Sequence, residues 1–156
     1  MHRPGHYGVA LACYAPVGAA AFAAGLESLA VAGGVIAVSG AMVPDLDQRV
    51  PGVSHRGITH TVWFVLALGA AVGIGGIVAG GVATGIIGRV AGVILVGAHL
   101  LADVLTPMGI RPFAPVTDRE YSLDVPTASN PVANYALLAV GIGVNVGGLL
   151  FARVVT

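Results

Sequence analysis

Long apolar runs, rich in Ala, Gly and Val, alternate with short polar stretches along this 156-residue chain. A helix needs about 20 mostly apolar residues to cross the hydrocarbon core of a bilayer. On that criterion the pattern predicts helices over residues 8–24, 28–43, 61–83, 86–106 and 132–152. We therefore expect an all-α fold, a polytopic membrane bundle of about five transmembrane helices that forms one domain over residues 1–156.

The helix predicted over 28–43 is short, because at about 1.5 Å per residue it reaches only about 24 Å. Together with the helix before it, it is expected to form a tilted or partly re-entrant hairpin. Paired glycines inside the helices, Gly80-Gly81 among them, are assigned to close helix packing in lipid rather than to phosphate binding.

Composition supports a membrane protein. The chain is 56% hydrophobic and 9% charged, with a mean hydropathy of +0.92, whereas soluble domains carry about 25% charged residues. Basic and acidic residues balance, so a basic footprint for nucleic acid is excluded. Cys13 is the single cysteine, which excludes a disulfide or a thiolate cluster within the chain. The first apolar run is not assigned as a signal peptide, because further spans follow it.

Charge asymmetry predicts the orientation. If the helices alternate in direction, the N-terminus and the loops 44–60 and 107–131 share one side of the membrane. That side carries Arg3, Arg49, Arg56, Arg111 and Arg119. The other side carries only Arg89 and Arg153. The positive-inside rule therefore predicts that the first side, with the N-terminus, is cytoplasmic in the cell membrane.

Ionisable side chains gather in short segments at the predicted cytoplasmic edge. A histidine precedes the first helix, and the later segments read PDLD, SHRGITHT and HLLAD. The candidate metal ligands in them are His6, Asp45, Asp47, His55, His60, His99 and Asp103. His99 and Asp103 are four residues apart on one helix face, and Asp45 and Asp47 flank a single residue, so each pair can grip a common ion.

Nitrogen and oxygen ligands suit zinc, manganese or iron(II), and the lack of thiolates argues against a closed structural zinc site. Each segment alone also has a structural interpretation. His99 and Asp103 can be a helix-packing pair, PDLD a helix stop with a capping aspartate, and HRGITH an interfacial loop. Their convergence on one edge, where buried charge is costly, favours a functional site.

In this order, the histidine before the first helix, PDLD, HRGITHT and HLLADVLTPMGIRPFAP resemble the YdjM-type family of inner-membrane metal-dependent hydrolases. That family is similar to the zinc-dependent phospholipase C and P1 nuclease group, all-helical enzymes that use a small zinc cluster on phosphodiesters. The resemblance implies a membrane-bound hydrolase of phosphoesters, with the candidate ligands above holding a few divalent ions, zinc first and manganese or iron(II) as alternatives.

The expected mechanism is metal-activated water. Asp45 or Asp47 bridges ions or accepts the proton of the water, and Arg56 steadies the phosphate with a bidentate contact. Arg56 can equally be a snorkelling arginine. Further hydrogen bonds that orient ligands are expected from Thr59, Thr61 and Thr106, which can instead cap helices. Arg111 is expected either to bind an anionic substrate or to anchor its loop at lipid headgroups.

Other classes of function remain open. The same His/Asp cluster suits a metal-ion or proton transporter, although transport favours ionisable groups stepped through the membrane depth. A metal-stabilised scaffold without activity is a third interpretation. The expected partners are the lipid bilayer and a phosphoester, either a phospholipid headgroup or a small soluble molecule. The sequence does not decide between these two, nor does it give the oligomeric state.

Overall fold

A computed structural model describes residues 1–125 and 130–155. Its elements are α1 (Arg3–Ala23), α2 (Glu27–Ser39), the 3-10 helices η1 (Pro44–Arg49) and η2 (Ile58–His60), α3 (Val62–Val104) and α4 (Pro131–Val155). Within these described ranges there is no strand, only an isolated bridge between Ile110 and Tyr121. The all-α prediction is therefore confirmed.

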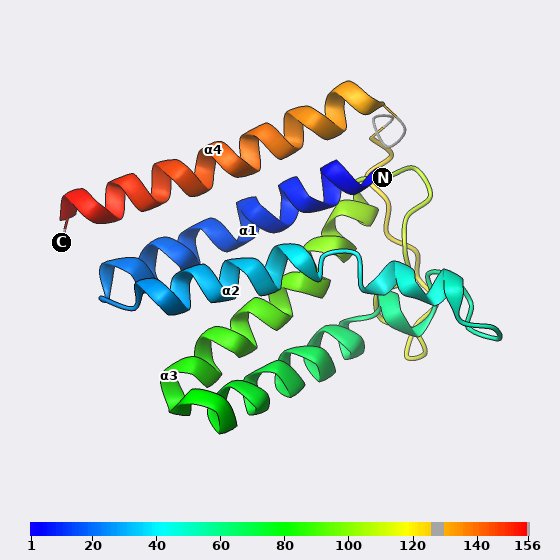
Figure 1. The fold of residues 1–156 in the computed structure, drawn as a ribbon. Helices are drawn as coiled ribbons and strands as arrows, with labels where there is room; N and C mark the ends of the chain where they lie inside the picture. Colours follow the sequence, from blue (N-terminus) through cyan, green and yellow to red (C-terminus); the bar gives the residue numbers. More distant parts are fainter. Residues whose placement is uncertain (126–129, 156) are drawn as a thin grey trace.

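α3 is a helical hairpin rather than one rod. Gly80 and Gly81 leave the helical conformation inside it, and Gly81 has a φ of 82°, which glycine adopts without steric cost. Figure 1 shows the two arms, in two shades of green, folded back on each other. The two helices predicted here are confirmed, but the turn comes earlier than the predicted gap at 84–85. Arg89 consequently lies inside the second arm and not in a loop.

The alternating direction of the helices brings the polar segments to one end of the molecule. Figure 1 shows the N-terminus, η1, η2 and the loop 105–125 at that end, which we call the polar end. The α1–α2 connection, the bend of α3 and the C-terminus lie at the opposite end. The sequence predicts that the N-terminus and the loops 44–60 and 107–131 share one side, and the path of the chain agrees with this grouping.

Three helices are long and apolar enough to cross a membrane by length and composition, namely α1, α3 and α4. With 13 residues, α2 reaches only about 20 Å at 1.5 Å per residue, which is less than the ~30 Å hydrocarbon core. The expectation of about five spanning helices is therefore confirmed in part. α3 supplies two arms, whereas α2 is too short to span.

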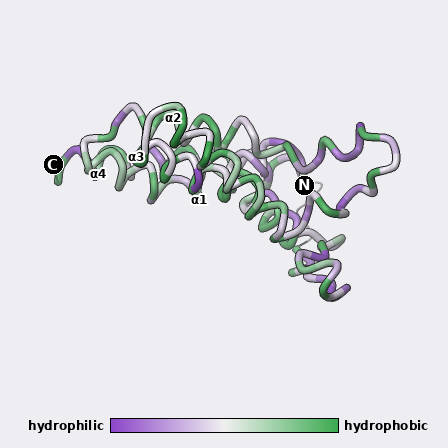
Figure 2. The backbone as a smooth tube through the Cα atoms, turned by 90° about the horizontal axis from the view of Figure 1, so that it is seen from below, coloured by the Kyte–Doolittle hydropathy of each residue, from purple (hydrophilic) through white to green (hydrophobic). Residues whose placement is uncertain are grey.

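The outer faces of the helices are apolar and have no protein partner. Val78, Val132 and Val154 are 82%, 77% and 84% exposed. Figure 2 shows hydrophobic colouring over most of the helices and hydrophilic stretches gathered in the loops beyond them. Soluble proteins rarely expose apolar surface on this scale, so lipid is the solvent that these faces fit. Exposed Trp63, at the polar end of α3, is the residue type typical of a membrane interface.

Glycines bring α1 and α4 into close contact. A Cβ on Gly8 would overlap the backbone of α4 at Leu137, and a Cβ on Gly141 would overlap the backbone at Gly8. The Asn145 side chain in α4 also donates a hydrogen bond to the Leu11 carbonyl of α1 at 2.6 Å. Small residues allow such close approach in lipid, and the resulting packing fixes the N-terminal turn of α1 at the polar end.

We predict that topology reporters fused at Thr84 and at Ala114 will report opposite sides of the membrane. Thr84 adjoins the bend of α3, where its hydroxyl donates to the Gly80 carbonyl, and Ala114 lies in the loop at the polar end. The arginine excess predicts that Ala114 is cytoplasmic. If both fusions report one side, the two-ended arrangement in the membrane is wrong.

Candidate metal centre

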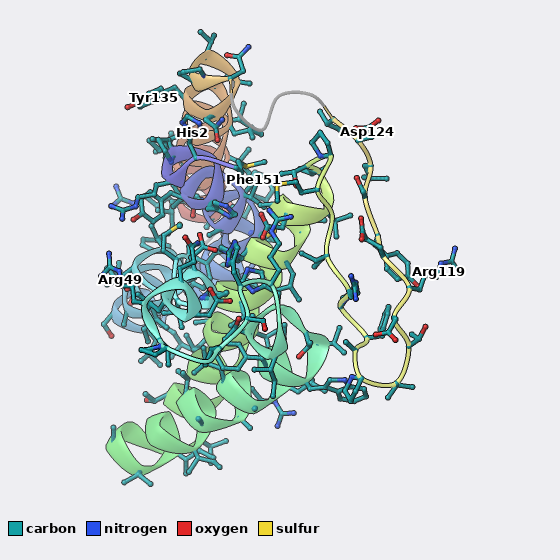
Figure 3. All side chains as sticks on the ribbon, turned by 90° about the vertical axis from the view of Figure 1, so that its right-hand side faces the viewer. His2, Arg49, Arg119, Asp124, Tyr135 and Phe151 are labelled. Atoms are coloured by element: carbon teal, nitrogen blue, oxygen red, sulfur yellow. The ribbon has the colours of Figure 1, made fainter. Side chains whose placement is uncertain are left out.

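Four chain segments meet at the polar end and bring the candidate ligands together. His6 lies in the first turns of α1, which begins beside Pro4, a residue suited to a helix start. Asp45 follows Pro44 in η1, and His60 ends η2. His99 and Asp103 lie one turn apart near the end of the second arm of α3. Figure 3 views the molecule from this end, with all described side chains drawn.

Carboxylate oxygens of Asp45 and Asp103 both lie close to the paired Nε2 atoms of His60 and His99. The two Nε2 atoms of His60 and His99 are 3.2 Å apart. Asp45 Oδ1 lies 3.6 Å from His60 Nε2 and 3.4 Å from His99 Nε2. Asp103 Oδ2 lies 3.5 Å and 3.4 Å from the same two atoms. Ligands about 2.0–2.2 Å from a tetrahedral zinc are about 3.3–3.6 Å from one another. The separations among His60, His99 and Asp103 therefore fit one ion, and so do those among His60, His99 and Asp45.

The hydrogen bonds behind the rings place a proton on both Nδ1 atoms, so Nε2 carries the lone pair wherever the ring is neutral. His99 Nδ1 lies 2.7 Å from the Ala41 carbonyl oxygen, which can only accept, so Nδ1 is the donor. Thr59 Oγ1 donates to Asp47 Oδ2 at 2.7 Å and therefore accepts from His60 Nδ1 at 2.9 Å. Acceptor atoms this close repel one another unless a cation or proton lies between them. The ligand atoms of His60, His99 and Asp103 form a group that could hold a metal ion.

The carboxylates beside His60 and His99 lie in a largely buried region, where an unpaired charge is costly. His60 and His99 are 0% exposed and Asp103 is 2% exposed, and an ionised carboxylate is costly to bury without a partner. Asp45 is less enclosed, with 22% of its side chain exposed. Burial raises the pKa of Asp45, but its contacts with His60 and His99 lower it more, and its pKa lies well below the usual range. Asp45 is therefore an anion at neutral pH.

Asp47 takes a different position from the one expected of a ligand. Its carboxylate accepts hydrogen bonds from Thr59 and from the Arg56 backbone, and it contacts His55 Nδ1 at 2.9 Å. Burial raises the pKa of Asp47, and the hydrogen bonds from Thr59 and His55 lower it below its usual value. Among the described residues it belongs to none of the groups of converging ligand atoms. It lies behind His60 and orients that ring.

His6 and His55 lie at the edges of the centre. The His6 ring stacks on that of His99, with centroids 4.1 Å apart, and His6 Nε2 is 3.8 Å from Asp103 Oδ1. In the described part of the chain, His6 Nδ1 has no hydrogen-bond partner. Ligand atoms of His6, Asp45 and His99 form one further convergent group, and those of Asp45, His55 and His60 form another. Asp45 is common to both groups and could bridge ions.

The Arg56 side chain makes its contacts within the protein. It adopts a left-handed backbone conformation with a φ of 60°, an uncommon state for a residue other than glycine. Its guanidinium donates to the Gly109 carbonyl at 2.6 Å and to Asp103 Oδ1 at 3.4 Å. The sequence predicts a bidentate phosphate contact for Arg56, but here the two terminal nitrogens are engaged in these contacts with Gly109 and Asp103.

The threonines divide between orienting and structural contacts. Thr59 links His60 to Asp47, as expected of an orienting group. Thr61 caps α3 by accepting from the Phe64 amide at 3.3 Å, which is its structural interpretation. The Thr106 hydroxyl donates to the Asp103 carbonyl at 2.7 Å and therefore braces the end of α3.

Arg111 lies apart from the converging atoms. It lines a cavity of about 370 Å³ together with His55, Arg56, Asp118 and Glu120. The carbonyls of Ala41 and Gly109, which hold His99 and Arg56, were not predicted from the sequence. Backbone groups carry no side-chain signature, so only the folded geometry reveals them.

These features define an all-helical membrane protein with a buried His/Asp centre at one end. The chain belongs to the YdjM inner membrane protein family, which matches residues 1–155. A comparison with curated proteins and one with solved structures give no match. The family and the apolar helices together support the membrane localisation.

We predict that removal of bound metal by a strong chelator will lower the melting temperature of the detergent-purified protein. Without a cation, the acceptors of Asp45, His60, His99 and Asp103 face one another unscreened, and the adjoining helix ends loosen. His99→Ala, which lacks one ligand, should melt lower from the start and respond little to chelator. A wild-type melting temperature that stays constant after confirmed metal removal would contradict the prediction.

Proposed function

We propose that this protein is a membrane-bound metal-dependent hydrolase of phosphoesters. The observation that carries the proposal is the close approach of the His60 and His99 Nε2 atoms, 3.2 Å apart, with one oxygen each of Asp45 and Asp103 lying 3.4 to 3.6 Å from both nitrogens. These four side chains would hold one divalent ion. Their nitrogen and oxygen atoms favour zinc, with manganese or iron(II) as alternatives.

A second ion is proposed beside the first. His6 and His55 each form a convergent group with Asp45, so a carboxylate shared between ions is available on either side. The orphaned His6 Nδ1 and the partly exposed Asp45 are the polar groups that such an ion would engage. Two adjacent ions suit phosphoester chemistry because they stabilise the attacking and leaving oxygens together.

When bound, a divalent ion here would lower the pKa of a coordinated water from ~15.7 towards ~7. The residues around it have separate tasks. Asp45, the most exposed carboxylate of the set, can accept a proton from water that enters. Asp47 and Thr59 orient the His60 ring and hold its proton on Nδ1, and Arg56 keeps Asp103 in position. The phosphoester class itself follows from the family resemblance, and the cytoplasmic location of the centre follows from the arginine excess.

The transporter alternative receives less support. Transport calls for ionisable groups stepped through the membrane depth, whereas the described residues of this centre gather at one end of the helices (Figure 1). At the opposite end, Arg153 lies over the Phe22 ring at 5.6 Å, which is a packing contact. The hydrolase is therefore the function that the geometry supports best.

We predict that Asp103→Asn will lose metal and activity. The amide keeps the size of the side chain but removes the anion, so metal affinity should fall by at least the 10–100-fold typical of a lost orienting partner. Metal content by mass spectrometry and hydrolysis of bis(4-nitrophenyl) phosphate measure the two effects. Arg119→Gln is the control, because Arg119 packs on Tyr121 at 5.2 Å away from the centre. Full metal occupancy and turnover in Asp103→Asn would reduce His99 and Asp103 to a packing pair.

Asp45→Asn and Asp47→Asn form a second, matched pair. Asp45 contributes an oxygen to the converging set, whereas Asp47 contacts His60 from behind. We therefore expect Asp45→Asn to lose the ion, and Asp47→Asn to retain it with affinity weakened about 10–100-fold. Metal titration of both variants at one pH measures the difference. Equal loss in the two variants would make Asp47 a ligand, as the sequence alone suggests.

A further inference from the structure

A hollow of about 700 Å³ lies between the start of α1 and η1 and borders the metal centre. Its polar lining comes from His2, Arg3, Asp45, Gln48 and Arg49. We propose that this α1–η1 hollow is the binding site for the anionic phosphate group of the substrate. The inference rests on the proposed function, and it assigns a role to two arginines that the centre itself does not use.

Asp45 connects the hollow to the centre. Its carboxylate faces His60 and His99 and also lines the hollow. Asp103, by contrast, has only 3% of its side chain exposed, and His60 and His99 are fully buried. An anion in the hollow would therefore approach the ion over the Asp45 side of the converging set.

The charges of the hollow fit an anion. Arg3 and Arg49 are its cationic side chains, and Asp45 is its one carboxylate, whose charge an ion in the centre would offset. In the cavity of about 370 Å³ on the loop 105–125, Arg56 and Arg111 are instead accompanied by Asp118 and Glu120. Of these two cavities at the polar end, the α1–η1 hollow is therefore the one with a surplus of positive charge once the ion is bound.

Arg3 and Arg49 also have their donors available. Over residues 1–125 and 130–155, neither guanidinium forms an ion pair, a side-chain hydrogen bond or a ring contact. Arg56 differs, because Asp103 and Gly109 engage its nitrogens. A free guanidinium presents paired N–H groups that match two phosphate oxygens, so this pair of arginines suits a phosphate ester.

The position of the hollow suits a substrate at the membrane surface. Figure 3 shows His2 and Arg49 on one side of the polar end, away from Arg119 and Asp124 of the loop 105–125. Phosphate groups of lipids lie at this depth, just beyond the apolar helices. The shared ligand chemistry is a phosphate monoanion or dianion, carried either by a lipid headgroup or by a soluble ester.

The test uses the whole 156-residue chain in maltoside detergent, which carries no phosphate, with inorganic phosphate as the probe and calorimetry as the readout. We expect wild type to bind phosphate and the double variant Arg3→Gln/Arg49→Gln to bind it about 10-fold more weakly, because two charged hydrogen-bonding groups are lost. Arg111→Gln, a matched change in the other cavity, should leave the dissociation constant unchanged. Equal phosphate affinity in wild type and the double variant, or no binding to wild type, overturns the inference.

A second set of samples, in the same detergent with phosphatidylglycerol added, identifies the source of the phosphate. If the hollow takes a lipid headgroup, phosphatidylglycerol should raise the apparent dissociation constant for inorganic phosphate in wild type but not in the double variant. An unchanged constant assigns the hollow to soluble esters, and either result supports the anion site.

Metal content and hydrolysis of bis(4-nitrophenyl) phosphate, measured on the same preparations, separate the two hypotheses. Arginine-dependent phosphate binding without metal or turnover supports the anion site and overturns the hydrolase. Full metal content and turnover, together with phosphate binding that does not depend on the two arginines, supports the hydrolase and overturns the anion site.

Discussion

Mutual repulsion among four acceptor atoms is the constraint on which the polar end depends. Nε2 of His60 and His99 lie 3.2 Å apart, and one oxygen each of Asp45 and Asp103 lies within 3.6 Å of both, in a largely buried region. Such an arrangement needs a positive charge at its centre, and it also needs rigid supports, because each acceptor would otherwise turn away. The Ala41 carbonyl supplies one of these supports and the Thr59 hydroxyl another.

The far end of the molecule makes this convergence possible. His60 precedes α3 and His99 lies near its end, 39 residues later in the chain. They meet because α3 reverses at Gly80 and Gly81, where the positive φ of Gly81 is required. An uninterrupted helix of 43 residues would hold its ends about 60 Å apart. A glycine turn remote from the centre thus brings the two histidine rings together.

Apolar periodicity predicted the helices well, because lipid-facing and buried positions are both hydrophobic and the runs are long. It also predicted the common edge, since alternation of direction needs only the number of helices. It also indicated the limited reach of α2, but it placed the turn of α3 at 84–85 rather than at Gly80 and Gly81, because the exact turn depends on local backbone conformation. Nor could it separate Asp45 from Asp47. Both are aspartates in one short segment, and only the fold shows that Asp47 faces the back of His60.

Arg56 shows that the sequence alone does not tell which arginine contacts the protein and which is available to a substrate. An arginine between two histidines is a natural candidate to bind phosphate, but its guanidinium contacts Asp103 and the Gly109 carbonyl. If it turned to a substrate, Asp103 would lose its countercharge at the moment when the centre gains an anion. The positive charge that binds an anionic substrate is better supplied by side chains that do not also hold other groups of the protein in place. Arg3 and Arg49 meet that condition, because they line the other side of Asp45.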